Sequence, residues 1–214
     1  VEFAGSLTAE RNQSSLSKQD IRQITNVLDG GADITQLKEY TMRMIERDPI
    51  YAQVDNYDKT LQEHRVISMQ KARKGASFWQ NIMNELERIG VSSERREIAE
   101  RHVWGLLSVS DPGTFTRLGV HTGLFLNAIK GQGHDSLREK VEPLASSLKI
   151  YGCFAMTEMG HGSYLRGLET TATFDEKRDE FIINSPTETA TKWWIGGAAH
   201  SATHAVVFAQ LIIK

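Results

Sequence analysis

The spacing of the apolar residues changes near Ile150, and this change divides the chain into a helical part and a β part. Before Ile150, apolar side chains recur every three or four residues, which is the period of an amphipathic helix. After it, short runs of β-branched and aromatic residues alternate with glycine-rich and polar turns. The sequence therefore predicts an α+β fold, with a helical domain over 1–149 and the first part of a β domain over 150–214.

Residues typical of helix starts and ends mark the first two predicted helices. Ser17 followed by Asp20 resembles a helix start, and the pair Gly30–Gly31 is typical of a helix end. The next helix is expected to end at Asp48, because Pro49 disfavours helical backbone in the residue before it.

Two longer helices are expected in the middle of the chain. Helical periodicity runs from about residue 59 to residue 89, and we expect a break near Gly75. Ser92 or Ser93 then has the side chain that favours the start of the next helix.

The last part of the helical domain contains a predicted turn and two predicted helices. The triplet D-P-G at 111–113 predicts a turn. A more apolar helix is expected over 118–129, and Asp135 or Ser136 is expected to cap the final one.

Two segments of the second part are predicted strands. Residues 171–184 (TATFDEKRDEFIIN) contain two β-prone runs around a charged turn, which predicts a hairpin. Residues 205–213 (AVVFAQLII) are predicted to form one buried strand. That apolar run is also far shorter than the roughly 20 residues of a membrane-spanning helix.

Charge and cysteine content narrow the classes of protein. The chain has 25 Lys+Arg and 27 Asp+Glu, a net charge of -2, so no overall basic excess favours nucleic acid or anionic lipid as a partner. The single cysteine, Cys153, excludes an intramolecular disulfide and favours a reducing compartment. The basic run at 70–74 (QKARK) is interpreted as a solvated helix face.

The segment CFAMTEMGHGSYLRGLETTA, residues 153–172, lies at the predicted domain boundary and matches none of the simple nucleotide or nucleophile motifs. Gly160 and Gly162 supply the first two glycines of G-x-G-x-x-G, but Leu165 stands where the third is needed. Ser163 lacks the glycines of the G-x-S-x-G elbow, and the chain contains no G-K-[ST] phosphate loop.

Two further candidates have ordinary structural interpretations. Cys153 has no positive neighbour in the sequence, which favours a small buried residue over a nucleophile. His200 and His204 have the spacing of two metal ligands on a helix, but Ser201 stands where H-E-x-x-H has its glutamate. No metal site is predicted.

The adjacent tryptophans Trp193 and Trp194 favour a ligand surface. They precede Ile-Gly-Gly, so an aromatic ring is expected beside exposed, glycine-lined backbone. Such a surface stacks and hydrogen-bonds a flat aromatic ligand. The residues themselves leave the identity of that ligand open.

The motifs T-E-x-G-H-G-S (157–163), G-L-E-T-T-A (167–172) and K-W-W (192–194), with the stretch 180–212, closely resemble the peroxisomal acyl-CoA oxidases of the acyl-CoA dehydrogenase superfamily. The helices before them, including 102–125, are similar to the N-terminal domain of that family. The resemblance implies a β-barrel-like domain from residue 150 onwards. It also implies a C-terminal helical domain, which this chain does not contain.

The resemblance implies FAD-dependent oxidation of a fatty acyl-CoA to the trans-2-enoyl-CoA, with oxygen reduced to hydrogen peroxide. It places Thr157, Trp194 and Gly196 at the flavin, and Ser163 and Gly162 at the acyl-CoA. Related dehydrogenases usually have Thr where Gly196 stands, so the glycine is interpreted as leaving room for oxygen.

The same resemblance implies that the catalytic base is a glutamate of the C-terminal domain, beyond Lys214, and that Glu158 is not the base. We therefore expect no catalytic residue here, and a fragment that is inactive alone. The full-length protein is expected to be a peroxisomal homodimer. The alternatives are an acyl-CoA dehydrogenase that uses an electron carrier and a non-catalytic ligand-binding fragment. A contact of the basic run with a CoA phosphate is the alternative to its solvated role.

Overall fold

The structure is a computed structural model that describes residues 2–52 and 56–213. Val1 and Lys214, the outer ends of the two predicted domains, lie outside the described residues. The chain divides into two compact units, one formed by Val1–Asp58 with Lys74–Ser110 and the other by Lys59–Arg73 with Asp111–Lys214. Helices followed by small sheets confirm the α+β fold.

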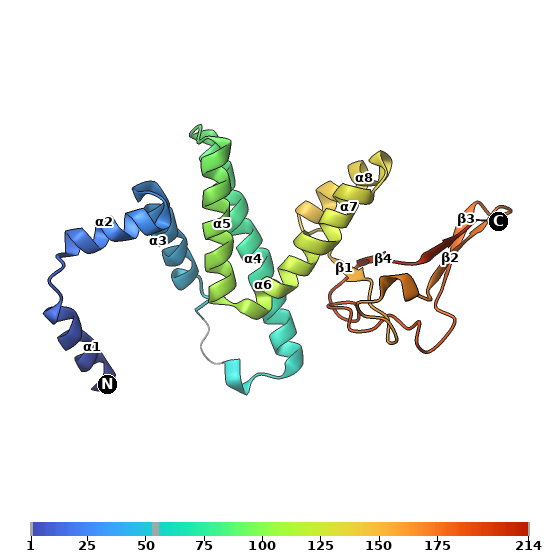
Figure 1. Cartoon of the computed structure of the whole chain (residues 1–214), viewed down its shortest axis with the longest axis horizontal. Coiled ribbons are helices and arrows are strands. Elements are labelled where there is room, and N and C mark those ends of the chain that lie inside the picture. Colours follow the sequence, from blue (N-terminus) through green and yellow to red (C-terminus); the bar gives the residue numbers. More distant parts are fainter. Residues whose placement is uncertain (1, 53–55, 214) are drawn as a thin grey trace. The chain divides into compact units, whose positions relative to one another are not determined.

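The first unit is helical, and its core lies between α3, α4 and α5 (Figure 1). The buried side chains of that core are apolar: Ile45, Phe78, Ile82, Val103 and Leu107. The elements are α1 (Glu2–Gln13), α2 (Lys18–Asp29), α3 (Ala32–Arg47), the 3-10 turn η1 (Asn56–Asp58), the later part of α4 (Leu61–Arg88) and α5 (Ser93–Ser110).

Helix α2 has the caps that its sequence predicts. The Ser17 hydroxyl accepts the Asp20 backbone N–H at 3.1 Å, and the Asp20 carboxylate accepts the Ser17 N–H at 2.8 Å. Gly30 ends the helix with φ at 90°, a left-handed conformation that glycine adopts without a steric penalty. Helix α3 ends with Asp48 in extended backbone, as expected for the residue before Pro49.

The predicted break near Gly75 is wrong, because α4 runs without interruption from Leu61 to Arg88. A Cβ at Gly75 would lie 2.8 Å from the Tyr51 hydroxyl and 3.5 Å from Leu107 Cδ2. The glycine is therefore a point of close packing. The predicted start of α5 is confirmed, since the Ser92 hydroxyl accepts the Arg95 N–H at 3.3 Å.

The interpretation of the basic run as a solvated face is wrong for Lys71, whereas the Lys74 side chain is 42% exposed. Lys71 is buried and its ammonium lies 2.8 Å from the Asp111 carboxylate. Lys74 forms an ion pair of 3.1 Å with the buried Asp48 carboxylate. Arg73, between them, is exposed. Both lysines are therefore engaged by carboxylates of the chain itself.

In the second unit, α6 (Pro112–Gly119), the π-helical segment η2 (Val120–Leu126) and α7 (Asn127–Gln132) follow one another without a break, and α8 (Asp135–Ser146) comes after them (Figure 1). The predicted turn at 111–113 is instead a helix start. Asp111 Oδ1 accepts the Thr114 N–H at 2.9 Å. Pro112 occupies the first turn, where its lack of a backbone N–H removes no hydrogen bond from the helix.

The cap predicted for α8 is also wrong. His134 is its N-cap residue, and the imidazole Nδ1 accepts the Ser136 N–H at 3.4 Å. A histidine ring nitrogen thus performs the function that was expected of the Asp135 or Ser136 oxygen.

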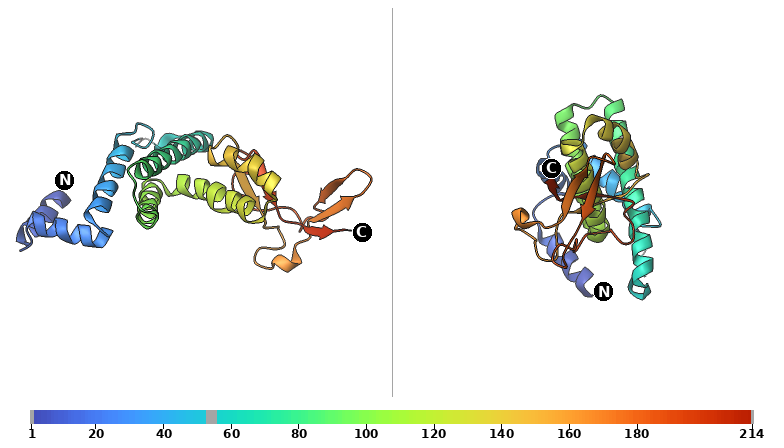
Figure 2. Two further views of the ribbon diagram at one scale, coloured as in Figure 1. Left: turned by 90° about the horizontal axis from the view of Figure 1, so that it is seen from above. Right: turned by 90° about the vertical axis from the view of Figure 1, so that its right-hand side faces the viewer.

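The strands form two small sheets in the second unit. In the first sheet, β1 (Gly152–Ala155) pairs in parallel with β4 (His204–Val207). In the second, β2 (Thr171–Asp175) lies between β3 (Glu180–Asn184), which is antiparallel to it, and β5 (Gln210–Ile212), which is parallel to it. The predicted hairpin is confirmed as β2–β3 and projects from the rest of its unit in Figure 2.

The prediction of one buried strand over 205–213 is wrong. The segment forms two short strands, β4 and β5, which belong to different sheets, and most of its side chains are exposed. The backbone changes sheet at Phe208, whose N–H donates to Ala155 O at 3.2 Å and whose carbonyl accepts Lys192 Nζ at 2.7 Å.

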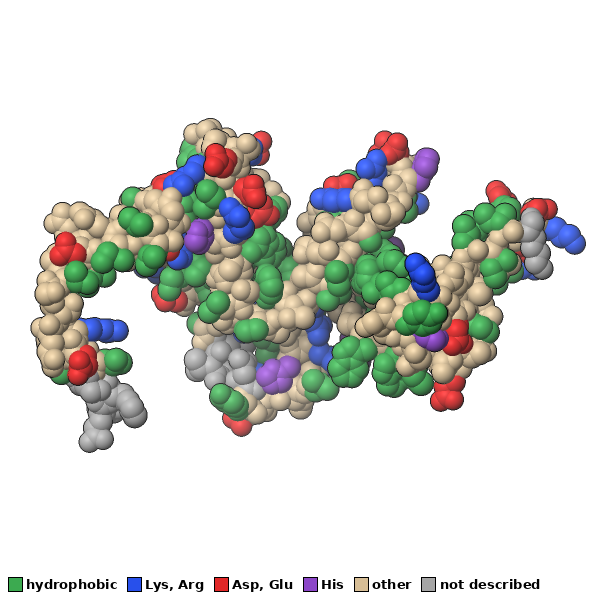
Figure 3. Space-filling view, in the orientation of Figure 1, with side chains coloured by type: hydrophobic (Ala, Val, Ile, Leu, Met, Phe, Trp, Pro, Cys, Tyr) green, Lys and Arg blue, Asp and Glu red, His purple; other side chains and the backbone are tan. Residues whose placement is uncertain are grey.

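The register of the second sheet places apolar side chains together on one of its faces. Ala172 is opposite Ile183 and Leu211, and Phe174 is opposite Phe181. Of these, Phe181, Ile183 and Leu211 are exposed, and hydrophobic side chains are visible over the hairpin in Figure 3. Among the described residues, no helix is long and apolar enough to cross a membrane.

Buried His121 connects the π-helical segment to β1. Its Nδ1 accepts the Gly152 N–H at 3.0 Å, and its Nε2 lies 2.9 Å from Ala145 O. The ring stacks on Phe125 and Tyr151, at centroid distances of 5.7 Å and 4.7 Å. Burial lowers the pKa of His121, so the neutral ring, protonated at Nε2, satisfies both contacts. This contact fixes where β1 begins and therefore where the following loop lies.

Candidate cofactor and substrate surface

The loop after β1 is held against residues 189–193 by backbone hydrogen bonds. Thr157 and Trp193 exchange two bonds: the Trp193 N–H donates to Thr157 O at 3.1 Å, and the Thr157 hydroxyl donates to Trp193 O at 2.7 Å. The Gly160 N–H donates to Thr189 O at 2.9 Å. A Cβ at Gly160 would lie 2.8 Å from Thr189 Cβ, so a side chain there would push the two segments apart.

A shallow hollow of about 430 Å³ is lined by Trp193, Trp194, Ile195 and Gly196. Trp194 is 91% exposed and has a φ of 62°, which non-glycine residues rarely adopt. At Gly196, an added Cβ would lie 4.0 Å from Val120 Cγ2 and farther from every other described residue apart from its chain neighbours, so the space there is open. The structure thus brings the predicted residues Trp194 and Gly196 into one hollow, next to the partner of Thr157.

Gly162 and Ser163 are exposed in the turn that follows. A Cβ at Gly162 would meet no described atom within 4 Å, and the Ser163 carbonyl accepts the Leu165 N–H at 3.1 Å. Within residues 2–52 and 56–213, no hydrogen bond links either of them to Thr157, Trp194 or Gly196. Their assignment to the substrate therefore stays a prediction.

Glu158 is the buried acid of this loop. Its side chain has 0% exposure, and among the described residues its carboxylate accepts from three donors. The backbone N–H groups of Glu169 and Thr170 donate to its two oxygens at 2.8 Å and 3.0 Å, and Lys192 Nζ lies 3.2 Å from Oε1. Burial on its own would raise the pKa of Glu158, but the hydrogen bonds outweigh burial and lower it to about 2. A carboxylate held in this way is a weak base.

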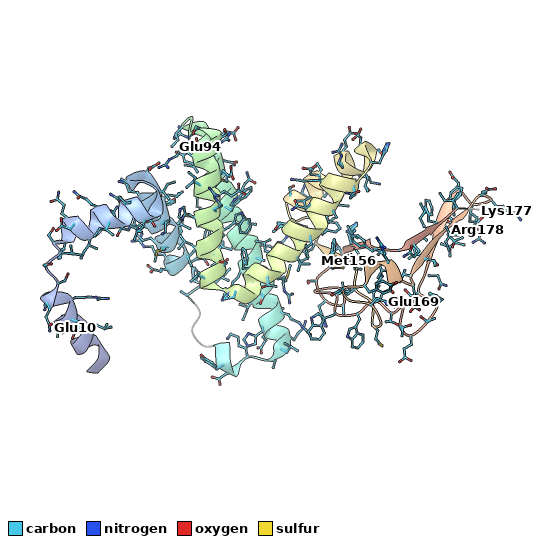
Figure 4. All side chains as sticks on the ribbon, in the orientation of Figure 1. Glu10, Glu94, Met156, Glu169, Lys177 and Arg178 are labelled. Carbon is cyan, nitrogen blue, oxygen red and sulfur yellow. The ribbon has the colours of Figure 1, made fainter. Side chains whose placement is uncertain are left out.

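His161 and Glu169 form a second polar cluster at the edge of the same turn. His161 Nε2 lies 2.8 Å from Glu169 Oε1, and the Thr187 and Thr189 hydroxyls donate to the same carboxylate. These hydrogen bonds lower the pKa of Glu169, and the one from Thr187 has the largest effect, followed by the one from His161. Figure 4 labels Glu169 of this cluster and Met156, the residue that directly follows β1.

Cys153 is the small buried residue that the sequence favoured, and the two histidines lie in different local structures. Cys153 is buried in β1, and burial raises the pKa of its thiol, which keeps the thiolate scarce. His204 begins β4 and His200 lies in the preceding turn, so the two do not share a helix face. The described part of the chain contains no group of three side chains that could hold a metal ion.

Reading the sequence missed the pair formed by Glu158 and Lys192. The two residues are 34 positions apart, and neither has a local signal that identifies its partner. A weak signal was that Glu158 follows the predicted site residue Thr157 and that Lys192 precedes the adjacent tryptophans Trp193 and Trp194.

Comparison with known proteins identifies the family. The family model described as acyl-coenzyme A oxidase N-terminal matches residues 20–151, which is more than half of the chain. The model described as acyl-CoA dehydrogenase, middle domain, matches residues 153–212. The chain belongs to the acyl-CoA oxidase family.

Individual relatives agree with this assignment. Acyl-coenzyme A oxidase 2 of Yarrowia lipolytica is 45% identical over 196 residues, covering 91% of this chain and 26% of the relative. The crystal structure of acyl-CoA oxidase1 from Yarrowia lipolytica matches with a TM-score of 0.77 and 40% identity, over 97% of this chain and 28% of that one. This chain therefore spans about a quarter of the length of these relatives.

A third match was solved with ligands. It is the crystal structure of acyl-CoA oxidase-2 from Caenorhabditis elegans bound with FAD, ascaroside-CoA and ATP. It is 28% identical, with a TM-score of 0.67, and the match covers 97% of this chain and 29% of that one.

Proposed function

We infer that this chain forms part of an FAD-dependent acyl-CoA oxidase, which converts a fatty acyl-CoA to the trans-2-enoyl-CoA and reduces oxygen to hydrogen peroxide. The observation that carries this proposal is the hollow at Trp193–Gly196 beside Thr157, in a chain of the acyl-CoA oxidase family. The FAD and the acyl-CoA thioester named for the Caenorhabditis elegans relative agree with it.

The residues of the hollow fit a large planar cofactor. An exposed indole at Trp194 offers a stacking face, and Gly196 offers open backbone with no side chain. The Thr157 hydroxyl gives its proton to Trp193 O, so toward a ligand it acts as an acceptor. Thr157, Trp194 and Gly196 would hold the flavin, which supplies the hydride acceptor and the route of electrons to oxygen.

The protein groups are proposed to orient the acyl-CoA, with Ser163 and Gly162 facing the thioester. Removal of the α proton needs a carboxylate base, and Glu158 does not qualify, because it is fully buried and its oxygens are engaged by donors. We propose that the base is a glutamate of a C-terminal helical domain beyond Lys214.

Other properties of the whole protein follow from the same proposal. A peroxisomal location and a homodimer are proposed for the full-length protein, on the resemblance to the peroxisomal oxidases. Molecular oxygen is the proposed electron acceptor.

The cofactor proposal predicts that Trp194→Ala weakens FAD binding about tenfold, because an aromatic stacking face is lost. Binding is measured by titrating FAD and following the flavin absorbance spectrum, with and without acyl-CoA. The matched control is Tyr57→Ala, which removes an aromatic ring that is 98% exposed outside the hollow. Equal FAD affinity of Trp194→Ala and Tyr57→Ala would contradict the proposed cofactor surface.

A dehydrogenase that passes electrons to a carrier protein is the second candidate, because the match over residues 153–212 is to an acyl-CoA dehydrogenase middle domain. Peroxide production by the full-length protein on addition of acyl-CoA distinguishes the two. Strict dependence on an added electron acceptor would favour the dehydrogenase.

Gly196 provides a sharper test of the oxidase. Gly196→Thr is expected to lower oxygen-dependent turnover several-fold while leaving reduction by acyl-CoA in the absence of oxygen within about twofold, because it fills space next to the flavin. Among the described residues, the Cβ of the new side chain would meet no atom closer than 4.0 Å. Stopped-flow measurement of the reductive and oxidative half-reactions checks it, and undiminished oxidase turnover in the variant would refute the role of Gly196.

A further inference from the structure

The Lys192 ammonium joins its own segment to two others, the loop after β1 and the residue after β4. It donates to Met156 O at 3.1 Å, to Glu158 Oε1 at 3.2 Å and to Phe208 O at 2.7 Å. Met156 and Phe208 directly follow β1 and β4, the two strands of the first sheet. An ammonium group has three protons, so these acceptors use its full capacity.

Glu158 extends this connection to the second sheet. Its carboxylate accepts the N–H groups of Glu169 and Thr170, the two residues that precede β2. The Thr170 hydroxyl in turn lies 3.0 Å from Ser185 Oγ, directly after β3. The ion pair of Glu158 and Lys192 thus joins the ends of strands from both sheets at one buried point.

Each member of the pair is adjacent in sequence to a residue of the proposed cofactor surface. Glu158 follows Thr157 and Lys192 precedes Trp193, and the backbones of Glu158 and Lys192 form an isolated antiparallel bridge. The two bonds between Thr157 and Trp193 lie directly beside that bridge. Trp194, next in the chain, has a left-handed φ of 62°, a conformation that persists only where the surroundings impose it.

We propose that the Glu158–Lys192 ion pair is a positioning device that holds the Thr157 hydroxyl and the Trp193–Trp194 segment in the geometry that binds the cofactor. This role rests on the proposed function of the hollow. Neither residue touches the ligand; both act through Thr157 and the two tryptophans. Buried ion pairs add little net stability compared with apolar residues, and a defined local geometry is the better reason for keeping one here.

Lys192→Met tests the proposal, because it keeps most of the side-chain volume and removes the ammonium. The control is Lys71→Met, which removes another buried ammonium of the same unit, paired with Asp111 at 2.8 Å and distant in sequence from the hollow. Glu158→Gln is the milder second variant. Hydrogen exchange of the amides of Gly160 and Trp193 reports on the loop without any cofactor.

We expect Lys192→Met to speed exchange of these two amides about tenfold or more, and Glu158→Gln to do so to a smaller extent, while Lys71→Met leaves them within about twofold. FAD affinity should fall about tenfold in Lys192→Met and remain near the wild-type value in Lys71→Met. Unchanged exchange in Lys192→Met, equal acceleration in Lys71→Met, or failure of both Lys192→Met and Glu158→Gln to fold would overturn the positioning role.

The FAD arm separates this proposal from the one on which it rests. If the wild-type full-length protein binds no FAD, the cofactor assignment fails, and the exchange comparison still decides whether the pair orders the loop. If the wild type binds FAD and Lys192→Met binds it equally well, the cofactor assignment stands and the positioning role is wrong.

Discussion

Gly152→Ala is expected to destabilise the second unit by about 3 kcal/mol or more, because its Cβ would be placed inside the Phe125 ring. Three ring atoms of Phe125 would lie 2.0 to 2.3 Å from that Cβ, and Phe125 is itself only 2% exposed. The Gly152 N–H also donates to His121, so the strand cannot move away without breaking that bond. Urea unfolding followed by near-ultraviolet circular dichroism measures the loss.

Gly131→Ala is the matched control for Gly152→Ala. An added Cβ at Gly131 in α7 meets no atom of the described residues within 4 Å, so this change is expected to be neutral or to stabilise by up to about 1 kcal/mol. Combining Gly152→Ala with Phe125→Leu should recover part of the loss, which shows that the two positions are coupled. A wild-type unfolding free energy in Gly152→Ala alone would show that the close approach of β1 and the π-helical segment is wrong.

Glu158→Gln is expected to cost about 3 kcal/mol of unfolding free energy at pH 7 and less in acid, because the pKa of this buried carboxyl falls from 4.5 to about 2 on folding. A lowered pKa in the folded state contributes stability that is complete above the unfolded-state value. That contribution decreases as the pH falls through the window from 4.5 to about 2. By about pH 3, roughly half of the difference between wild type and variant should be lost.

Urea unfolding of both proteins between pH 7 and pH 3 measures the change, and the difference between them isolates Glu158 from the other titrating carboxyls. Glu176→Gln, which alters an exposed acid in the turn of the β2–β3 hairpin, is the control and should change stability little at either pH. A wild-type-minus-variant difference that does not vary with pH would show that the Glu158 carboxylate is not held by the donors around it.

The helix boundaries that depend on neighbouring residues could be predicted. Ser17 and Asp20 satisfy each other's backbone donors within one turn, and Gly30 supplies a left-handed end. The β2–β3 hairpin likewise follows from two β-prone runs around a short charged turn. Such features form from contacts between residues only a few positions apart, so the local sequence contains all the information.

The secondary-structure predictions are wrong where a residue contacts a partner that is distant in the sequence. Gly75 was predicted to break a helix, but its missing side chain makes room for Tyr51. The apolar run 205–213 was predicted as one buried strand, but it divides between two sheets at Phe208. Local propensity gives no information about which neighbour a glycine or a strand will meet.

The candidate surface likewise has features that the sequence predicts and features that only distant contacts decide. The motifs around Thr157 and Trp193–Trp194 identified the family through their resemblance to the acyl-CoA oxidases, and the two tryptophans line the hollow. Their mutual approach, and the Glu158–Lys192 pair beside them, needed the tertiary structure. Burying an acid and an ammonium is favourable only when each meets its partners, and those partners come from segments as far apart as Met156 and Phe208.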